Sequence, residues 1–320
     1  MAFNVINPGL LCLIQDFGRY GYQHIGVTTG GPMDEHAFLW ANRLLNNAYD
    51  AAQLEITIGM VSLEAQSPTQ IAITGADLGA TINNQPVRPW QSFVINKGDQ
   101  ISFNRPRVGL RAYLAVQGGL QITSQLGSVA TVMREKLGGL NGDGKKLAAG
   151  DVLHYQPFNQ MVSQPFISKR VPEQFIPDYS VPLTLGVMLG YQCDSFSQVE
   201  INKLFTGDYK ITQDIDRMGY RLAGEPVNSV LNGIISEGIS YGAIQIPKDG
   251  QPIVLLRDRQ TIGGYPKIGC VTAIDAARLS QRGPGATVRF ALKDIHQAEA
   301  ERMIYNRFFG IQANRKKISE

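Results

Sequence analysis

The sequence contains little cysteine. Its three cysteines, Cys12, Cys193 and Cys270, are far apart and show no paired spacing. This spacing argues against a disulfide framework and against a metal site built from thiolates. The four histidines form no H-E-x-x-H or similar pair, so we expect no metal ion held by the protein. Unpaired cysteines are typical of a reducing compartment, and we expect a cytoplasmic protein.

Long hydrophobic runs and basic stripes are also missing. No apolar run approaches the ~20 residues that a membrane span needs, and the first residues do not resemble a secretory signal. The sequence has 30 Lys and Arg against 27 Asp and Glu, and its longest basic run is "NRKK". Aromatic residues do not alternate with these Lys and Arg residues, as they commonly do in nucleic-acid-binding proteins. We therefore expect neither a membrane nor a nucleic acid as a partner.

Glycine and proline, by contrast, are frequent, with 34 and 16 residues in a chain of 320. Short apolar runs such as "LEITIGMVSLEA" and "LRAYLAVQGGL" alternate with turn signals, which predicts many short strands in barrels or sandwiches. Helices are few. Their predicted starts carry the capping residues Asp34, Ser197, Thr272 and Asp294. The fold class is therefore mainly β with a few helices.

The segment 156–182 is rich in Pro, Gln and Ser and has weak periodicity. Such composition is typical of a connection between domains. We therefore predict an N-terminal β-rich domain over residues 1–170 and a C-terminal β domain over residues 171–320.

One nucleotide-binding motif is present only in part. The stretch Gly139–Lys146 has the spacing of a phosphate loop, but Lys146 occupies the position of the magnesium-binding Ser or Thr. A phosphate loop also needs a helix after it, whereas "LAAGDVLHY" predicts a turn and a strand. We favour a surface hairpin.

A polar, glycine-rich segment leads into the first predicted helix. Arg19 is permanently charged and can hold a carboxylate or phosphate at two points. Gly30 and Gly31 precede the helix, where backbone amides can face an anion or a developing oxyanion. If this stretch is extended, Tyr22 and His24 lie on one face. The alternative is a polar loop with a buried, satisfied histidine.

A second polar segment surrounds the short apolar strand "IVLL". Side chains directly after a buried strand are well placed to line the floor of a pocket. The candidates here are Glu237, Gln245, Asp258, Gln260, Thr261, Tyr265 and Lys267, and a third cluster, "DRMGYRLAG", adds Arg217. The alternative is a hairpin in which Asp258 and Arg259 form a solvated pair.

Three further residues in or near the first helix are interpreted structurally. His36 is expected on the exposed side of the helix. Asn42 within an apolar helix and Glu55 within an apolar strand need buried hydrogen-bonding partners, and such lone residues are more often structural than catalytic.

The sequence resembles the carboxyltransferase-type family that includes the second subunit of allophanate hydrolase, KipA-like proteins and the C subunit of bacterial 5-oxoprolinase. The resemblance spans residues ~15–282 and rests on several motifs in the order of the family. The matching stretches are "QDFGRYGYQHIGV", "GGPMDEHAFLWANRLLNN", "LEIT", "TGADLGA", "GLRAYLAVQGGL", "DRMGYRLAG" and "GAIQIPKDGQPIVLLRDRQTIGGYPKIG".

The resemblance implies two cyclophilin-like β-barrel domains with a cleft between them. It also implies a heteromer with a subunit-1-like (KipI-like) protein. Most free-standing bacterial members resemble 5-oxoprolinase subunits, which use ATP with magnesium and a lactam-opening third subunit to convert 5-oxo-L-proline to L-glutamate. In fused relatives the region transfers CO2 from carboxybiotin to urea.

The sequence lacks a biotinyl-lysine signature and an attached biotin carboxylase, which favours the 5-oxoprolinase interpretation. Two alternatives stay open. One is a biotin-dependent carboxyltransferase that acts on urea or a similar amide, and the other is a non-catalytic KipA-like regulator.

Both enzymatic interpretations require an unreactive amide or urea carbonyl to be polarised. Lys267 or Arg217 would neutralise a phosphate or the substrate carboxylate, and Asp258 would hold the ring N–H or act as a base. Backbone amides would stabilise charge on the carbonyl oxygen. The catalytic candidates are His24, Asp258, Lys267 and Glu237, and the substrate-binding candidates are Arg19, Tyr22, Gly30, Gly31, Arg217, Gln245, Gln260, Thr261 and Tyr265.

Overall fold

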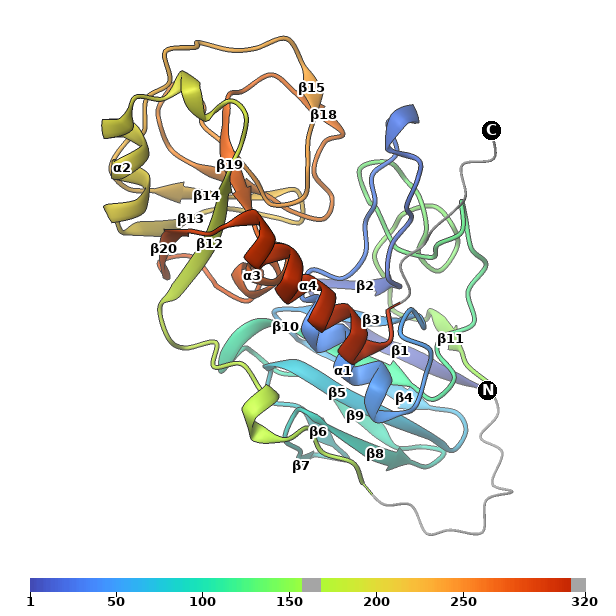
Figure 1. Ribbon diagram of the computed structural model, residues 1–320. Coiled ribbons are helices and arrows are strands. Elements are labelled where there is room, and N and C mark those ends of the chain that lie inside the picture. Colours follow the sequence, from blue (N-terminus) through green and yellow to red (C-terminus); the bar gives the residue numbers. More distant parts are fainter. Residues whose placement is uncertain (157–167, 312–320) are drawn as a thin grey trace.

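A computed structural model describes residues 1–156 and 168–311. Figure 1 shows two β-rich parts, with the last helix lying across the first part. The described residues form many short strands and four α-helices, which confirms the predicted fold class of a mainly β chain with few helices. Within the same residues, no helix is long and apolar enough to cross a membrane.

The N-terminal strands form two sheets around a shared core. One sheet has six strands in the order β11-β1-β4-β9-β6-β7, and the other has five in the order β2-β3-β10-β5-β8. The strands are β1 (Ala2–Pro8), β2 (Leu11–Gln15), β3 (Gln53–Thr57), β4 (Val61–Ala65), β5 (Thr69–Asp77), β6 (Thr81–Ile82), β7 (Gln85–Pro86), β8 (Gln91–Ile95), β9 (Gln100–Ser102), β10 (Val108–Val116) and β11 (Val152–His154). Apolar side chains from both sheets pack into one cluster.

The C-terminal strands close into a barrel in the order β12-β19-β16-β17-β14-β13-β20. Its strands are β12 (Leu183–Leu189), β13 (Tyr209–Ile215), β14 (Gly219–Ala223), β16 (Ala243–Gln245), β17 (Ile253–Leu255), β19 (Lys267–Val271) and β20 (Thr287–Leu292). A separate ribbon pairs β15 (Glu237–Gly238) with β18 (Ile262–Gly263). The barrel core also contains Met33, a fully buried residue contributed by the N-terminal part.

The helices begin where the sequence predicts. They are α1 (Glu35–Leu44), α2 (Gln198–Thr206), α3 (Ala273–Leu279) and α4 (Ile295–Phe309), with short 3-10 turns η1 (Gln23–Ile25), η2 (Glu173–Phe175) and η3 (Cys193–Ser195). Each α-helix has a side chain that accepts a hydrogen bond from a backbone N–H in its first turn. For α1, Asp34 accepts from Ala37 at 3.1 Å. These caps satisfy donors that lack a partner within the helix.

Helix α4 returns from the barrel to cover α1 (Figure 1). Phe309 of α4 packs in the same apolar cluster as Trp40 of α1. His36 lies under this cover, where Nε2 is 2.8 Å from the carbonyl oxygen of Phe175. The expectation that His36 faces solvent is therefore wrong, because two segments distant in sequence pack over that face of α1.

Part of the predicted connection, residues 157–167, lies outside the described residues. The described part begins against the N-terminal sheets, where Ser92 donates its backbone N–H to the carbonyl of Lys169 at 2.9 Å. Farther along, the hydroxyl of Tyr179 donates to Asp34 at 2.7 Å. The segment therefore packs against α1 on its way to the barrel.

Candidate functional site

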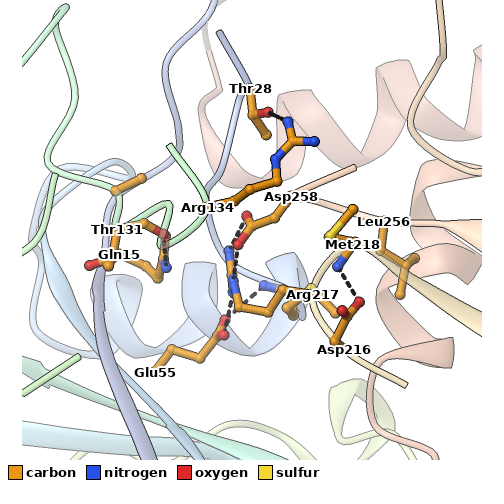
Figure 2. Close-up of polar contacts among 12 residues, drawn as sticks. Gln15, Thr28, Glu55, Thr131, Arg134, Asp216, Arg217, Met218, Leu256 and Asp258 are labelled. Carbon is orange, nitrogen blue, oxygen red and sulfur yellow. Dashed lines mark hydrogen bonds and ion pairs between the residues drawn. The ribbon is translucent and has the colours of Figure 1, made fainter. Parts of the chain in front are cut away.

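The two parts of the molecule are joined by a buried ion-pair network around Arg217 (Figure 2). Its Nε and Nη2 donate to the two carboxylate oxygens of Asp258 at 2.8 and 2.9 Å. Its Nη1 donates to Glu55 at 2.5 Å, and Nη2 also reaches the carbonyl of Gly31 at 2.8 Å. Arg217 comes from the β13–β14 turn and Glu55 from β3, so one guanidinium connects the barrel to the N-terminal sheet.

Burial and charge act in opposite directions on this network. Burial would lower the pKa of Arg217, but Asp258 and Glu55 outweigh it and raise that pKa. Burial raises the pKa of Asp258 even though Arg217 favours its ionised form. Burial would raise the pKa of Glu55, but Arg217 and a second cation, Arg111, favour its ionised form and lower that pKa. Each of the three guanidinium nitrogens of Arg217 donates to a protein group, which fits a structural role.

Glu55 has the buried partners that the sequence predicts for it. Besides Arg217, it accepts the backbone N–H of Met33 at 2.8 Å and the hydroxyl of Tyr113 at 2.7 Å. Asn42 likewise donates to the carbonyls of Tyr49 and Ala51 at 3.3 and 2.9 Å. Both predictions of buried partners are confirmed.

Arg19 faces the interior of the N-terminal part. Its guanidinium donates to three backbone carbonyls, those of Gln125 at 3.3 Å, Ser128 at 3.3 Å and Ala130 at 3.0 Å. Only 2% of its surface is exposed. These contacts tie Arg19 to the backbone of residues 125–130. Burial lowers the pKa of Arg19, and nearby carboxylates, Asp258 of the barrel among them, oppose this shift.

The predicted segment from Tyr22 to His24 is not extended. Residues Gln23–Ile25 form η1, which ends at Gly26 in the left-handed conformation. The expectation that Tyr22 and His24 share a face of an extended strand is therefore wrong. His24 is exposed at this turn. The turn arises because Gly26 can adopt a φ of 83° that closes it.

Gly30 and Gly31 follow each other in the loop before α1, and Gly31 contacts the C-terminal part through Arg217. Both have positive φ angles, 64° and 89°, as glycine allows. A Cβ on Gly31 would lie 2.9 Å from the carbonyl oxygen of Phe17, so the chain needs glycine there for space as well. The carbonyl of Gly31 accepts from Arg217, so this turn is tied to the ion-pair network.

The two predicted polar segments meet at a narrow crevice. It is lined on one side by Gln23, Thr28 and Thr29 and on the other by Arg259, Gln260 and Thr261. Gln23 Nε2 donates to the carbonyl of Ile239 at 3.1 Å. The Thr28 hydroxyl lies 3.3 Å from the carbonyl of Arg259. These contacts fix the N-terminal loop against two loop residues, Ile239 after β15 and Arg259 in the turn that follows β17.

A cavity of about 510 Å³ at the mouth of the barrel adjoins this crevice. Three of the predicted residues, Gln245, Gln260 and Tyr265, are among its lining residues. The remaining lining residues are Gln213, Asp214, Ile215, Asp216, Met218, Gly219, Arg221, Ile239, Ile253, Leu255, Arg259, Gly263 and Gly264. Gln260 and Arg259 line both spaces, so the cavity and the crevice share a wall. We call this cavity and its crevice the barrel-mouth site.

Two predicted catalytic residues, Glu237 and Lys267, pair with each other beside this site. Their side chains form an ion pair, and the hydroxyl of Tyr191 also donates to Glu237. Gln192 Nε2 donates to Glu237 at 2.7 Å. Lys267 and Tyr191 together lower the pKa of Glu237 through hydrogen bonds. Neither side chain is among the residues that line the cavity.

Asp258 is not among the lining residues of the barrel-mouth site, and only 5% of its surface is exposed. The solvated Asp258–Arg259 pair considered as an alternative is wrong, because Asp258 pairs with Arg217 in the interior. Arg259 is also buried, and it is a lining residue that the sequence interpretation does not select. Its position next to Gln260 and Thr261, directly after a buried strand, is the signal that could have identified it.

A larger cavity of about 660 Å³ lies among α1, α3 and α4. It contains none of the predicted site residues. Three cations there are paired, Arg278 with Asp275, Arg302 with Glu35 and Lys293 with Glu301. We therefore place the candidate site at the barrel mouth rather than in the larger cavity.

Gly139–Lys146 is followed by a turn and by strand β11, as predicted. No helix N-terminus therefore follows this loop to receive a phosphate. Among the residues described, no group of three or more His, Cys, Asp or Glu side chains is arranged to hold a metal ion.

Comparison with known proteins gives the family. The family model "Carboxyltransferase domain, subdomain A and B" matches residues 25–292, which include both sides of the crevice except Gln23. The chain belongs to this carboxyltransferase family. This confirms the resemblance noted in the sequence.

Curated relatives of the chain include 5-oxoprolinase C subunits and urea amidolyases. The chain is 31% identical to the 5-oxoprolinase C subunit of Escherichia coli, over 95% of this chain and 96% of that protein. It is 30% identical to the 5-oxoprolinase C subunit of Haemophilus influenzae, over 89% of each. It is 32% identical to urea amidolyase of Lachancea kluyveri, but there it covers only 17% of that protein.

Two solved structures are similar in fold to this chain. The Kluyveromyces lactis urea amidolyase matches with a TM-score of 0.89 and 29% identity, over 96% of this chain and 20% of that one. The protein TTHA0988 matches with a TM-score of 0.78 and 30% identity, over 91% of this chain and 55% of that one. The chain thus corresponds to a part of each of these larger proteins. The curated relatives compared above are named as enzymes or enzyme subunits.

Proposed function

We propose that this chain is the C subunit of an ATP-dependent 5-oxoprolinase complex that converts 5-oxo-L-proline to L-glutamate. The observation that supports this best is the extent of the match. The chain aligns with 96% of the Escherichia coli 5-oxoprolinase C subunit, at 31% identity. In this proposal the chain acts with a subunit-1-like partner and a lactam-opening third subunit. ATP with magnesium is consumed as a substrate of the assembled complex.

The barrel-mouth site has the chemistry that a lactam needs. A lactam carbonyl reacts only when hydrogen-bond donors polarise its oxygen or when it is phosphorylated. Gln245 and Gln260 carry amide groups that can donate to a carbonyl oxygen and accept from a ring N–H. Because the N-terminal loop closes one side of the site through Gln23 and Thr28, both parts of the chain contribute to it.

The ion pairs around the site have distinct proposed tasks. Arg217 and Asp258 hold the β13–β14 turn against the N-terminal sheet, which keeps the two sides of the site at a fixed relative position. In the Lys267–Glu237 pair, Glu237 belongs to the β15–β18 ribbon and lies opposite Gly263, so the pair ties this ribbon to β19. Direct catalytic roles for Asp258 and Lys267 stay predictions, and loss of activity in Asp258→Asn and Lys267→Ala with unchanged stability would support them.

A biotin-dependent carboxyltransferase acting on urea is the second candidate. The TM-score of 0.89 to the Kluyveromyces lactis urea amidolyase favours it. Carboxybiotin would then be supplied by another protein, and the donors at the barrel mouth would polarise the urea carbonyl instead of a lactam.

An ATPase measurement separates the two candidates. The chain is mixed with its subunit-1-like partner and the third subunit, and phosphate release is followed with 5-oxo-L-proline or with urea. We expect release to depend on 5-oxo-L-proline and glutamate to form in equal amount. Urea-dependent consumption of carboxybiotin with no response to 5-oxo-L-proline would reject the proposal in favour of the second candidate.

A further inference from the structure

Arg259 is a buried cation without a carboxylate partner. It is 7% exposed, yet none of the ion pairs found among the described residues includes it. Its neighbours in the chain differ in this respect, since Arg257 pairs with Glu35 at 2.7 Å and Asp258 pairs with Arg217. A buried charge is normally paired, so an unpaired one beside a cavity points to a partner supplied from outside.

The hydrogen bonds of Arg259 leave part of its guanidinium available. Nε donates to the carbonyl of Ile239 at 3.0 Å, and Nη1 makes a long contact of 3.4 Å with the carbonyl of Leu256. No described residue accepts a hydrogen bond from Nη2. The Nε contact holds the side chain in place on the wall of the cavity, so its position does not depend on a ligand.

The electrostatic surroundings of Arg259 disfavour an uncompensated charge and so favour binding of an anion beside it. Burial lowers its pKa, and the neighbouring cation Arg257 lowers it further. The ring of Tyr241 lies 5.9 Å from the guanidinium carbon, but an aromatic face compensates a charge only weakly. A bound anion would therefore relieve repulsion between two cations as well as fill the open donors.

The other charged residues of the cavity lie in β13, in the turn after it and in β14. Asp214 and Asp216 come from the end of β13 and the turn after it, and Asp216 is engaged by the backbone N–H groups of Met218 and Gly219 at 2.7 and 3.0 Å. Arg221 pairs with Asp249 at 3.0 Å. Arg259 is thus the lining cation whose charge is not already matched by a protein group.

We propose that Arg259 binds the carboxylate of the substrate, so that the barrel-mouth site selects a small amide carrying a carboxylate over a neutral one. This inference rests on the proposed function and specifies its substrate class. The planar guanidinium matches the two oxygens of a carboxylate. A lactam anchored in this way would place its ring amide among Gln245 and Gln260. Neutral urea would leave the guanidinium uncompensated.

Binding of matched ligands tests the proposal on the full chain assembled with its partner subunits. Isothermal titration compares 5-oxo-L-proline with 2-pyrrolidinone, the same ring without the carboxylate. We expect the wild type to bind 5-oxo-L-proline at least about tenfold more tightly, the size of a charge-assisted hydrogen bond. Equal affinities, or no binding of 5-oxo-L-proline, would overturn the proposal.

Two variants assign the preference to this side chain. In Arg259→Gln the advantage of 5-oxo-L-proline over 2-pyrrolidinone should disappear, and Arg259→Lys should recover part of it. Arg289→Gln is the control, since Arg289 is an exposed barrel residue paired with Asp208. If Arg259→Gln folds with an unchanged melting temperature and keeps the preference, the assignment is wrong.

Inorganic phosphate serves as a third ligand, because a guanidinium also binds phosphate. Tighter, Arg259-dependent binding of phosphate than of 5-oxo-L-proline would reassign the position to a phosphate. The outcome is separable from that of the proposed function. A complex that binds 5-oxo-L-proline through Arg259 but releases no phosphate from ATP would refute the function and leave this inference intact.

Discussion

Arg217 and Asp258 form a two-point ion pair in the interior, and the same guanidinium donates to Glu55 on the N-terminal sheet. The contact joins parts of the chain 162 residues apart. Asp258 directly precedes the segment that carries Arg259, Gln260 and Thr261. The geometry of the barrel-mouth site is therefore coupled to the packing of the two parts of the molecule.

Replacing Arg217 by Met should destabilise the protein strongly. The change leaves two carboxylates, Asp258 and Glu55, buried without their shared cation, which costs about 3–5 kcal/mol. The measurement is the free energy of unfolding in urea at neutral pH. The control is Arg221→Met in the adjoining strand, where the pair with Asp249 is partly exposed and about 0.2–1 kcal/mol is expected. Similar losses in both variants would contradict the structural role of Arg217.

His36 should make stability depend on pH below neutrality. Burial lowers the pKa of His36 from its usual value of 6.5, so the unfolded chain binds a proton more readily than the folded one. Stability is then full above pH ~6.5 and falls as the pH decreases, by up to about 1.4 kcal/mol per pH unit. The free energy of unfolding between pH 5 and pH 8 measures this.

The matched variants for this pH dependence are His36→Gln and His296→Gln. His36→Gln keeps a donor for the carbonyl of Phe175 and should flatten the slope. His296 is exposed on α4, and its replacement should leave the slope unchanged. A slope that survives in His36→Gln would show that another group is responsible.

Gly263→Ala should weaken substrate binding with little effect on stability. The new Cβ would lie 2.6 Å from Ile239 Cδ1 and 2.8 Å from Gln245 Nε2, both at the ends of flexible side chains. The amide of Gln245 would then move within the cavity wall, so we expect a higher KM for 5-oxo-L-proline. Gly238→Ala in the paired strand is the control, because a Cβ there meets nothing within 4 Å. An identical KM in both variants would count against a role for Gln245 in binding.

The sequence predicts what is decided locally. The helix starts at Asp34, Ser197, Thr272 and Asp294 are confirmed, because a capping side chain and the backbone it binds lie within three residues. The strand-rich fold class is confirmed for the same reason, since alternation and turn residues act over a few positions. The predicted roles of the individual site residues stay predictions.

The sequence does not predict contacts that depend on distant segments. His36 lies on a helix whose face is covered by residues 175 and 309, far from it in sequence. The sequence suggests an anionic ligand for Arg217, but both of its carboxylate partners come from other elements. Arg259 follows the same buried strand as Gln260 and Thr261, but the sequence does not reveal that Asp258 pairs with Arg217 and leaves Arg259 without a carboxylate. In each case the pairing is settled by tertiary packing, which local spacing does not encode.

A crystal structure of the assembled complex with 5-oxo-L-proline tests the central claim most directly. We predict electron density for the lactam in the barrel-mouth site, with its carboxylate at Arg259 and its ring beside Gln245 and Gln260. Density in the cavity among α1, α3 and α4, or a lactam bound wholly by another subunit, would contradict the claim.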